Sequence, residues 1–416
     1  MPTISRQVSL KSGESIYYSV DAQSVVSAEK YVSIQNIKRL LGLPTVHPRF
    51  RIYVLNQDET IWYPIPNEDI VLGGSYDENY QQTGQRRTFS FSVFNDDGKY
   101  NPSPNKLWAG TKVRLDIGVE SPGEDTIIWF QRGVFVLSAP SISKSAESKT
   151  VSFSCEDKYS LFGDKSGVLF TTTEIPVGTE IEGLIKDTIA FDNGNGYPLD
   201  PKPIFYHPAF KGKKTPIKIS LSPGDTIESL LSQIADILSA EIFYDATGTL
   251  VVVPIVEVMS DGDKPVLYDY DISNLQSENF SFDMSSFINC VQVVGGNING
   301  HTCRATAQND DPMSPLSISK IGRRTLVVND SNITTDIIAQ ERADYELRKV
   351  LVAKSTLSSG VFFNPLLSVN NLVTYTDKFF NLRRDRFLIQ SISFSIDYSG
   401  TMSLNVSNIN NLPFIR

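Results

Sequence analysis

The chain contains little cysteine, and this excludes a fold held together by disulfides. Its 416 residues include three cysteines, Cys155, Cys290 and Cys303, with no close pairing pattern. Cys290 and Cys303 remain a conceivable pair, but two small buried apolar side chains are the simpler interpretation. We therefore expect synthesis in a reducing cytoplasm rather than a disulfide framework.

Histidine is equally scarce, and its placement argues against a metal or catalytic centre. His47, His207 and His301 have no second histidine four positions away and no Cys-x-x-Cys nearby. His301 and Cys303 are two apart, a spacing that rarely gives nucleophile–base geometry on a strand. Asp96-Asp97-Gly98 lacks the glutamate that a calcium loop needs, so we predict a turn. We predict no catalytic residue, no cofactor and no metal.

Basic residues and long apolar runs are also lacking. The formal net charge is −9 and the isoelectric point is near 5.0. A protein that grips phosphate backbones needs clustered lysine and arginine, so DNA binding is not the expected main function, although DNA can pass nearby. No run approaches the ~20 apolar residues of a membrane span, and the N-terminus lacks the pattern of a signal peptide.

Two similar hairpins are the most informative feature that is present. Residues 387–396 alternate apolar and small polar side chains and lead through Asp397-Tyr398-Ser399-Gly400 into residues 401–406. Residues 135–143 and 150–155 repeat this pattern around a turn at 146–149. Alternation of this kind predicts antiparallel strands. The repeat predicts two copies of one β-domain in a single chain.

Between the two hairpins the periodicity changes from strand to helix. Apolar stripes at helical spacing occupy residues 181–189 and 227–238, with Asp225 and Glu228 at capping-box spacing, and a hairpin follows at 241–254. A further helix carries Ala339 and Leu347, and a short one is expected at 34–41 before Gly42.

These patterns predict a mainly β fold with an α+β insert, in which two related β-barrel domains flank a small α+β domain. The expected divisions are an N-terminal arm over residues 1–49, a β-barrel domain over 50–165, the α+β insert over 166–265, and a second β-barrel domain with one helix over 266–416.

Three groups of residues resemble motifs of a known family. The first has a strand, an Asp-Gly turn and a Gly-x-x-Val-x-Leu run, the second a helix and hairpin, and the third a loop and helix. They are Phe94-Asn95-Asp96-Asp97-Gly98-Lys99-Tyr100-Asn101-Pro102 with Trp108 and Gly110-Thr111-Lys112-Val113-Arg114-Leu115; Ile175-Pro176-Val177-Gly178-Thr179, Gly224-Asp225-Thr226 and residues 243–252; and Ile321-Gly322-Arg323-Arg324, Thr334-Thr335 and Ala339-Gln340-Glu341-Arg342-Ala343 with Leu347. In this order they resemble the central hub of bacteriophage contractile-tail baseplates, and more broadly phage tail hub proteins.

The resemblance implies a structural, non-enzymatic role in the virion. Such a hub is a homotrimer that forms a pseudo-sixfold ring and acts as a symmetry adapter between the sixfold tail tube protein and a threefold central spike or tail-tip protein. Other baseplate proteins are implied as neighbours, and DNA passes through the axial channel during ejection without specific binding. The implied location is the tail baseplate of the virion, after assembly in the host cytoplasm.

Six residues are candidates for subunit contacts. For the arginines the alternative is a solvated face of the protein, and for Trp108 the alternative is packing in the core. Trp108 lies in a loop rich in asparagine and proline and is the candidate anchor, whereas Trp62 and Trp129 are expected in the core. The basic candidates are Arg323, Arg324, Arg383, Arg384 and Arg386.

Two other functions stay open. One is a tail-associated cell-wall hydrolase or peptidase, which would need a clustered active site. The other is a host glycan-binding tail protein, since long tails use many β-sandwich domains.

Overall fold

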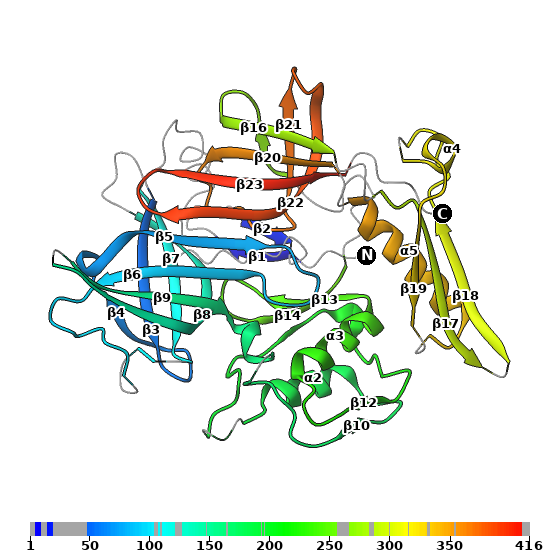
Figure 1. The fold of residues 1–416 in the computed structure, drawn as a ribbon, viewed down its shortest axis with the longest axis horizontal. Helices are drawn as coiled ribbons and strands as arrows, with labels where there is room; N and C mark the ends of the chain where they lie inside the picture. Colours follow the sequence, from blue (N-terminus) through cyan, green and yellow to red (C-terminus); the bar gives the residue numbers. More distant parts are fainter. Residues whose placement is uncertain are drawn as a thin grey trace. The chain divides into compact units, whose positions relative to one another are not determined.

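A computed structural model of the chain describes residues 5–9, 15–19, 48–103, 107–108, 110–120, 127–146, 148–163, 165–192, 194, 196–255, 266–282, 287–298, 300–314, 316–330, 333–352 and 355–409. The chain divides into two compact units. The first comprises Met1–Val256, Val361–Asn370 and Ser391–Ser403, and the second comprises Glu257–Gly360, Asn371–Gln390 and Leu404–Arg416. The mainly β fold class predicted from the sequence is confirmed (Figure 1).

A large antiparallel sheet lies in the first unit. Its strands are β3 (Pro48–Leu55), β4 (Ile61–Ile65), β5 (Ile70–Asn79), β6 (Arg87–Phe94), β7 (Lys112–Glu120), β8 (Ile127–Lys144) and β9 (Lys149–Asp157). Their spatial order is β4-β3-β7-β8-β9-β6-β5. Beyond β5, residues Ser391–Ile396 of β22 (Leu382–Ile396) continue the sheet. The predicted hairpin at 135–155 is confirmed as β8–β9.

Alternation along these strands builds the core, because successive side chains point to opposite faces of a sheet. On β6, Phe89 and Phe91 face inward and stack with ring centroids 5.2 Å apart. Phe153 of β9 packs on Phe91, and Phe135 of β8 packs on Phe89. Such offset and tilted ring pairs stabilise a core beyond the area they bury.

The α+β segment also belongs to the first unit. It contains β10 (Thr173–Ile175), α2 (Ile181–Ile189), β11 (Phe205–Tyr206), β12 (Ile219–Leu221), α3 (Ile227–Leu238), β13 (Ala240–Tyr244) and β14 (Leu250–Pro254), and Figure 1 shows α2 and α3 side by side. Both apolar stripes enter one core. The predicted capping box is wrong in detail: the Oγ1 atom of Thr226 caps α3 by accepting from the N–H of Ser229, whereas Asp225 accepts from the N–H of Ser222.

The second unit holds another sheet in sequence-distant pieces. Its strands are β15 (Val266–Tyr270), β16 (Leu275–Phe282), β20 (Ser355–Phe362) as far as Gly360, β21 (Leu372–Asp377), the N-terminal part of β22 and the C-terminal part of β23 (Thr401–Asn408). β15 pairs with β21 in parallel, and β21 pairs with β22 in antiparallel fashion. β22 and β23 are neighbours, so the predicted C-terminal hairpin is confirmed.

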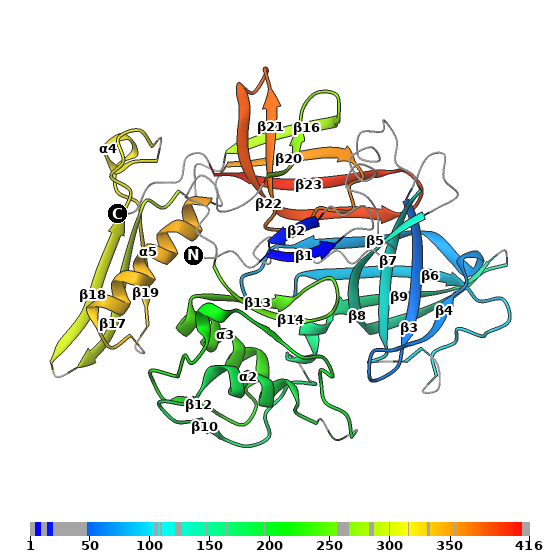
Figure 2. The same ribbon diagram turned by 180° about the vertical axis from the view of Figure 1, so that it is seen from behind.

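A smaller layer in the second unit pairs a three-stranded sheet with a helix. The order is β18 (His301–Gln308), β17 (Cys290–Ile298) and β19 (Thr325–Asn329), with α4 (Ile318–Ile321) before β19 and α5 (Asp336–Val352) after it. Figure 2 shows α5 lying along this sheet. Ala339, Ala343 and Leu347 of α5 pack on Val291 and Val293 of β17. The small alanines allow close approach of the helix to the sheet.

The two large sheets share one strand order. The first reads β3-β7-β8-β9-β6-β5 and the second reads β15-β21-β22-β23-β20-β16. Replacing the strands of the first by those of the second, in chain order, converts one arrangement into the other. The first copy has β4 inserted after β3, and the second has β17 to α5 inserted after β16. One pairing differs, because β3 and β7 are antiparallel whereas β15 and β21 are parallel.

Several smaller features complete the described chain. Near the N-terminus, β1 (Ser5–Ser9) and β2 (Ser15–Ser19) form a hairpin that the sequence patterns did not indicate. The helix predicted at 34–41 lies outside the described residues. The turn predicted at Asp97 is confirmed, because its carboxylate accepts from the N–H of Lys99. Single-turn 3-10 helices occupy Asn67–Asp69, Lys158–Leu161 and Pro208–Phe210. Of the helices described, none has the length and apolar character needed to cross a membrane.

Candidate assembly surfaces and buried charge clusters

Trp108, the candidate anchor, lies in the segment between β6 and β7. Its side chain is 46% exposed, while the neighbouring Leu107 is fully buried. The N–H of Trp108 donates to Oγ1 of Thr111, and the N–H of Thr111 donates back to the carbonyl of Trp108, both at 3.0 Å. Trp108 therefore presents a large apolar side chain to solvent, and its own backbone is held by hydrogen bonds to Thr111. Trp129 is buried as expected, but Trp62 is half exposed, so its predicted core position is wrong.

Arg323 and Arg324 lie immediately before β19 and are exposed. Two hydrogen bonds with Asn289 hold the backbone of Arg324. The N–H of Arg324 donates to Oδ1 of Asn289 at 2.8 Å, and the backbone N–H of Asn289 donates to the carbonyl of Arg324 at 3.0 Å. The guanidinium of Arg323 donates to Gln308 at 3.4 Å. These two arginines therefore extend from an anchored backbone.

Arg383, Arg384 and Arg386 lie on β22, in a different sheet from Arg323 and Arg324. The ladder between β21 and β22 is irregular at this point, and Arg384 has a φ of +57°. Its guanidinium forms an ion pair with Asp269 of β15. The structure thus places the five predicted arginines on two sheets. Their role in subunit contacts stays a prediction.

One face of the first sheet is covered by serine hydroxyls, which no sequence motif singled out. Serines are cross-strand partners of one another over five neighbouring strands. The hydroxyl oxygens of Ser75 and Ser90 lie 2.9 Å apart, and those of Ser92 and Ser152 lie 2.8 Å apart. This serine face comprises Ser395, Ser75, Ser90 and Ser154 in one row and Ser92, Ser152 and Ser141 in the next. Asp77 and Glu156 are the cross-strand partners of Thr88, which lies two positions before Ser90 on β6, so the two acids border the first row. The side chains of the serine face are therefore small and uncharged, and two carboxylates lie at its border.

A buried charge cluster centres on Glu59, in the turn between β3 and β4. Its carboxylate forms ion pairs with Lys112 at 2.9 Å, Lys158 at 2.6 Å and Lys202 at 3.2 Å. Lys158 also pairs with Asp200 at 2.6 Å. Burial alone would raise the pKa of Glu59, but Lys158 and Lys112 outweigh it and hold that pKa below its ordinary value. The cluster joins the first sheet to the α+β segment.

A second buried cluster centres on Glu78 of β5. Its carboxylate pairs with Arg87 at 2.6 Å and Arg132 at 3.2 Å, and accepts from the hydroxyls of Tyr76 and Ser368. All four partners lie in the first unit. Ser368 belongs to the segment between β20 and β21, so the cluster ties that returning segment to β5.

A third buried pair joins Arg86 to Glu241 at 2.9 Å. Tyr80 and Asn370 also donate to Glu241, and the guanidinium of Arg86 lies 3.7 Å from the centroid of the Phe243 ring. A guanidinium over an aromatic face adds cation–π attraction to the ion pair. These contacts connect the first sheet, the α+β segment and the returning segment within one unit.

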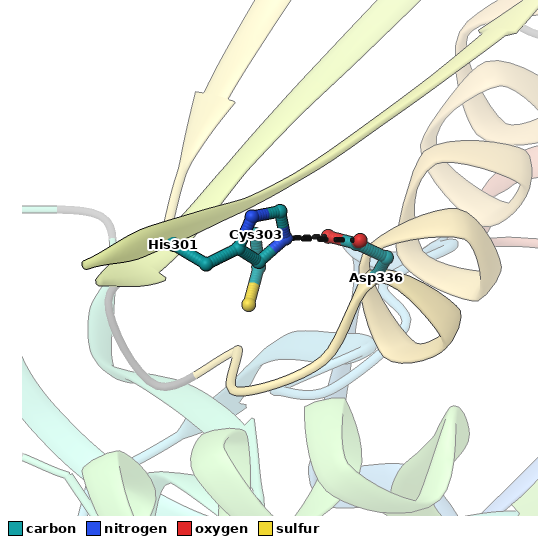
Figure 3. A group of neighbouring side chains, drawn as sticks. All are labelled: His301, Cys303 and Asp336. Carbon is teal, nitrogen blue, oxygen red and sulfur yellow. Dashed lines mark hydrogen bonds and ion pairs between the residues drawn. The ribbon is translucent and has the colours of Figure 1, made fainter. Parts of the chain in front are cut away.

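One group of side chains has the composition of a metal-ligand set. His301 and Cys303 of β18 meet Asp336, the first residue of α5, and one ligand atom from each lies within 4.8 Å of the others (Figure 3). The Oδ1 atom of Asp336 accepts from the N–H of Arg304 at 2.9 Å, and this bond, with His301 beside it, lowers the pKa of Asp336. Sequence spacing missed Asp336, which lies 35 positions beyond His301.

The three cysteines, all of them described, are buried free thiols. Burial raises the pKa of the Cys155 thiol well above its ordinary value, so this side chain is a small apolar core residue rather than a nucleophile.

Comparison with solved structures gives the fold a context. No known protein-family profile matches the sequence, and no curated protein is significantly similar to it. The structure resembles the tail protein from Neisseria meningitidis MC58, with a TM-score of 0.60 and 15% identity over 88% of this chain and 98% of that one. It also resembles the 43 kDa tail protein of prophage MuSo2 from Shewanella oneidensis, with a TM-score of 0.58 and 16% identity over 88% and 98% of the chains. The chain has a tail-protein fold.

A third solved structure extends this likeness. The prophage tail protein gp18 from Listeria monocytogenes EGD-e has a TM-score of 0.54 and 13% identity over 86% of this chain and 94% of that one. All three likenesses run through nearly the whole length of each partner. The tail-protein fold therefore extends over most of the chain and is not confined to one segment.

Proposed function

We propose that the chain is a structural, non-enzymatic hub of a phage tail baseplate. In this proposal it forms a homotrimer that joins a sixfold tail tube to a threefold central spike or tail-tip protein, around an axial channel for DNA. The tail-protein fold and the repeated strand order support the proposal. The virion is the corresponding location.

The shared strand order of the two large sheets carries the argument. The orders β3-β7-β8-β9-β6-β5 and β15-β21-β22-β23-β20-β16 coincide strand for strand. Independent sheets of this size rarely adopt one order by chance, because many orders satisfy the rules of strand connection. The coincidence supports a duplication, with the β8–β9 and β22–β23 hairpins as equivalent parts.

A duplicated chain solves a symmetry problem. A threefold protein offers each surface three times per ring, whereas a sixfold tube requires six similar surfaces. Two copies of one sheet in each of three chains would supply six. Only the backbone shape at the docking surface has to agree, so strand order can be kept while side chains diverge.

The serine face fits a path along which DNA passes without being held. Retention of DNA requires lysine or arginine beside the phosphates, whereas this face presents hydroxyls with Asp77 and Glu156 at its border. The net charge of −9 acts in the same direction. We assign the lining of the channel to this face, and contacts with neighbouring proteins to Trp108 and the exposed arginines.

Imaging of particles that contain the chain tests the proposal. The expected result is a ring of three copies in which six similar lobes meet the tail tube, with the serine face toward the axis. Sedimentation of the purified chain is expected to give the mass of three subunits. A ring with only three equivalent lobes, or a position outside the tail, would contradict the hub assignment.

Activity assays separate the alternatives. Purified chain incubated with bacterial cell walls is expected to release no fragments, and a glycan panel is expected to show no saturable binding. Release of muropeptides would indicate the hydrolase function instead, and saturable glycan binding by single chains would indicate host recognition.

A further inference from the structure

We propose that His301, Cys303 and Asp336 form a zinc site with an open fourth position. The site lies in the small layer of the second unit, where β18 meets the first turn of α5. It is independent of the hub function, and each can fail without the other.

The spacing of the donor atoms is close to that of a tetrahedral site. The Nε2 atom of His301 lies 3.1 Å and 3.2 Å from the two carboxylate oxygens of Asp336. With metal–ligand bonds of about 2.0–2.3 Å, donor atoms around tetrahedral zinc lie roughly 3.3–3.6 Å apart. The sulfur of Cys303 lies within 4.8 Å of the other two donors.

The sulfur needs only a local adjustment to join the other donors. Figure 3 shows the imidazole turned toward the carboxylate, with the Cys303 sulfur pointing to one side of their contact. Rotation about the Cα–Cβ bond of Cys303 is a change between staggered rotamers and leaves the backbone in place. The metal-free arrangement is then a histidine–aspartate hydrogen bond beside a thiol.

The backbone of β17 approaches Cys303 closely at Gly295. β17 carries a bulge between Val294 and Asn297, opposite this part of β18. Within the bulge, a Cβ atom added to Gly295 would lie 3.0 Å from the Cβ of Cys303 and 2.7 Å from the carbonyl oxygen of Ile333. Bulges redirect side chains and are frequent beside functional sites.

The donor set and its exposure select the metal and the coordination. Thiolate, imidazole and carboxylate together suit Zn²⁺, whereas Ca²⁺ and Mg²⁺ prefer oxygen donors. The thiol side is closed, since Cys303 is 2% exposed, and the other side is open, since the side chains of His301 and Asp336 are 68% and 55% exposed. One water can therefore complete four-coordination.

The Asp336 carboxylate is already oriented. Its Oδ1 atom accepts from the N–H of Arg304 at 2.9 Å, so β18 itself holds this ligand. Hydrogen bonds of this kind fix ligand direction and strengthen metal sites. Bound zinc would clamp the start of α5 to β18 and stabilise the helix that covers the small sheet.

Cobalt titration of the full, tag-free chain tests the site. Co²⁺ occupies tetrahedral zinc sites and absorbs in the near ultraviolet when a thiolate is a ligand. We expect one Co²⁺ per chain with this thiolate absorption, its displacement by Zn²⁺, and a higher unfolding temperature in Zn²⁺ than in chelator. The absorption identifies cysteine ligation and distinguishes the site from surface binding to histidine and aspartate.

Matched variants assign the ligand. Cys303→Ala is expected to lose the absorption, whereas Cys290→Ala, at an equally buried free thiol on the neighbouring strand, is expected to keep it. His301→Gln and Asp336→Asn change exposed side chains, and each is expected to weaken Co²⁺ affinity at least about tenfold.

Three results would overturn the proposal. They are absence of stoichiometric Co²⁺ binding, Co²⁺ binding without thiolate absorption, and equal loss of absorption in Cys290→Ala and Cys303→Ala. Should Cys303→Ala fail to fold, unchanged affinity in both His301→Gln and Asp336→Asn overturns it, and reduced affinity in both supports it.

Discussion

Glu78 and Arg132 form a buried ion pair at 3.2 Å, and the same guanidinium donates to the carbonyl oxygens of Pro365 and Leu367. One arginine therefore neutralises a carboxylate of β5 and satisfies the backbone of a segment more than 200 residues away, since Arg132 and Pro365 are 233 positions apart. The backbone carbonyls need this donor, because an unpaired polar group inside a protein is costly.

Removing the charge of Glu78 is expected to destabilise the first unit strongly. In Glu78→Gln, Arg87 and Arg132 remain buried without their counter-charge, and breaking such a pair costs about 3–5 kcal/mol of unfolding free energy. Urea unfolding of the purified chain measures the loss.

The control for this prediction is an exposed pair. Lys186→Ala breaks the surface ion pair with Glu182, 2.6 Å long on one face of α2, and is expected to cost less than about 0.5 kcal/mol. A loss in Glu78→Gln no larger than in Lys186→Ala would show that the buried pair is not required.

Stability is expected to fall as the pH rises through neutrality because of Glu278. Burial, and then the nearby carboxylate of Asp377, raise the pKa of Glu278 from 4.5 to about 7. The folded chain therefore holds this proton more tightly than the unfolded chain. The resulting stabilisation is complete below pH 4.5 and is lost as the pH rises through about 7.

Glu278→Gln tests this dependence, because glutamine cannot titrate. Unfolding midpoints of wild type and variant are measured between about pH 5 and about pH 8, and the wild-type decline is expected to exceed that of the variant. Glu182→Gln, which changes a partly exposed carboxylate on α2, is expected to keep the wild-type slope. Parallel slopes in all three proteins would contradict the assignment to Glu278.

Gly248 is expected to tolerate no side chain. Its φ is +76°, and an added Cβ would lie 2.8 Å from Cγ2 of Val134 on β8. Gly178 has a similar φ of +87° but open space around it. Both alanine variants should lose about 1–2 kcal/mol from backbone strain, and Gly248→Ala should lose about 1–3 kcal/mol more from the contact. Equal losses of stability in the two variants, measured by thermal unfolding, would show that the contact with Val134 does not contribute.

Trp108→Ala is expected to weaken self-association while leaving the fold intact. The indole is 46% exposed, so the folding free energy should change by less than about 0.5 kcal/mol. As a central interface anchor it would contribute about 2 kcal/mol or more to association, measured by sedimentation equilibrium. Trp62→Ala, at a 50% exposed indole on β4, is the matched control and should leave association unchanged. Equal effects of the two substitutions on self-association would show that Trp108 is not an interface anchor.

Local patterns predicted the hairpins and the helical stripes well, because alternation and helical periodicity are recorded in neighbouring residues. β8–β9, β22–β23, α2 and α3 all appear where periodicity indicated them. The cap of α3 was misassigned because Asp225 and Thr226 are both suitable caps and only backbone geometry decides between them.

The buried clusters could not be predicted, because their members come from distant positions. Glu78 and Ser368 are 290 positions apart, and nothing near either residue indicates the other. The same limit applies to Asp336, which only the packing of α5 on β18 brings to His301. Strand direction is also not encoded locally, so the parallel pairing of β15 with β21 has no signature in residues 266–270.

That reversed strand limits how the two halves can be recombined. The β8–β9 and β22–β23 hairpins enter and leave their sheets at equivalent places, so grafting one onto the other's position keeps the chain path. β15 is parallel to its neighbour β21, whereas β3 is antiparallel to its neighbour β7. A strand grafted from one position to the other would therefore have its two chain ends at the wrong ends of the sheet, and its connecting loops would have to be rebuilt. We therefore expect the hairpins to be exchangeable in this chain and the opening strands not to be.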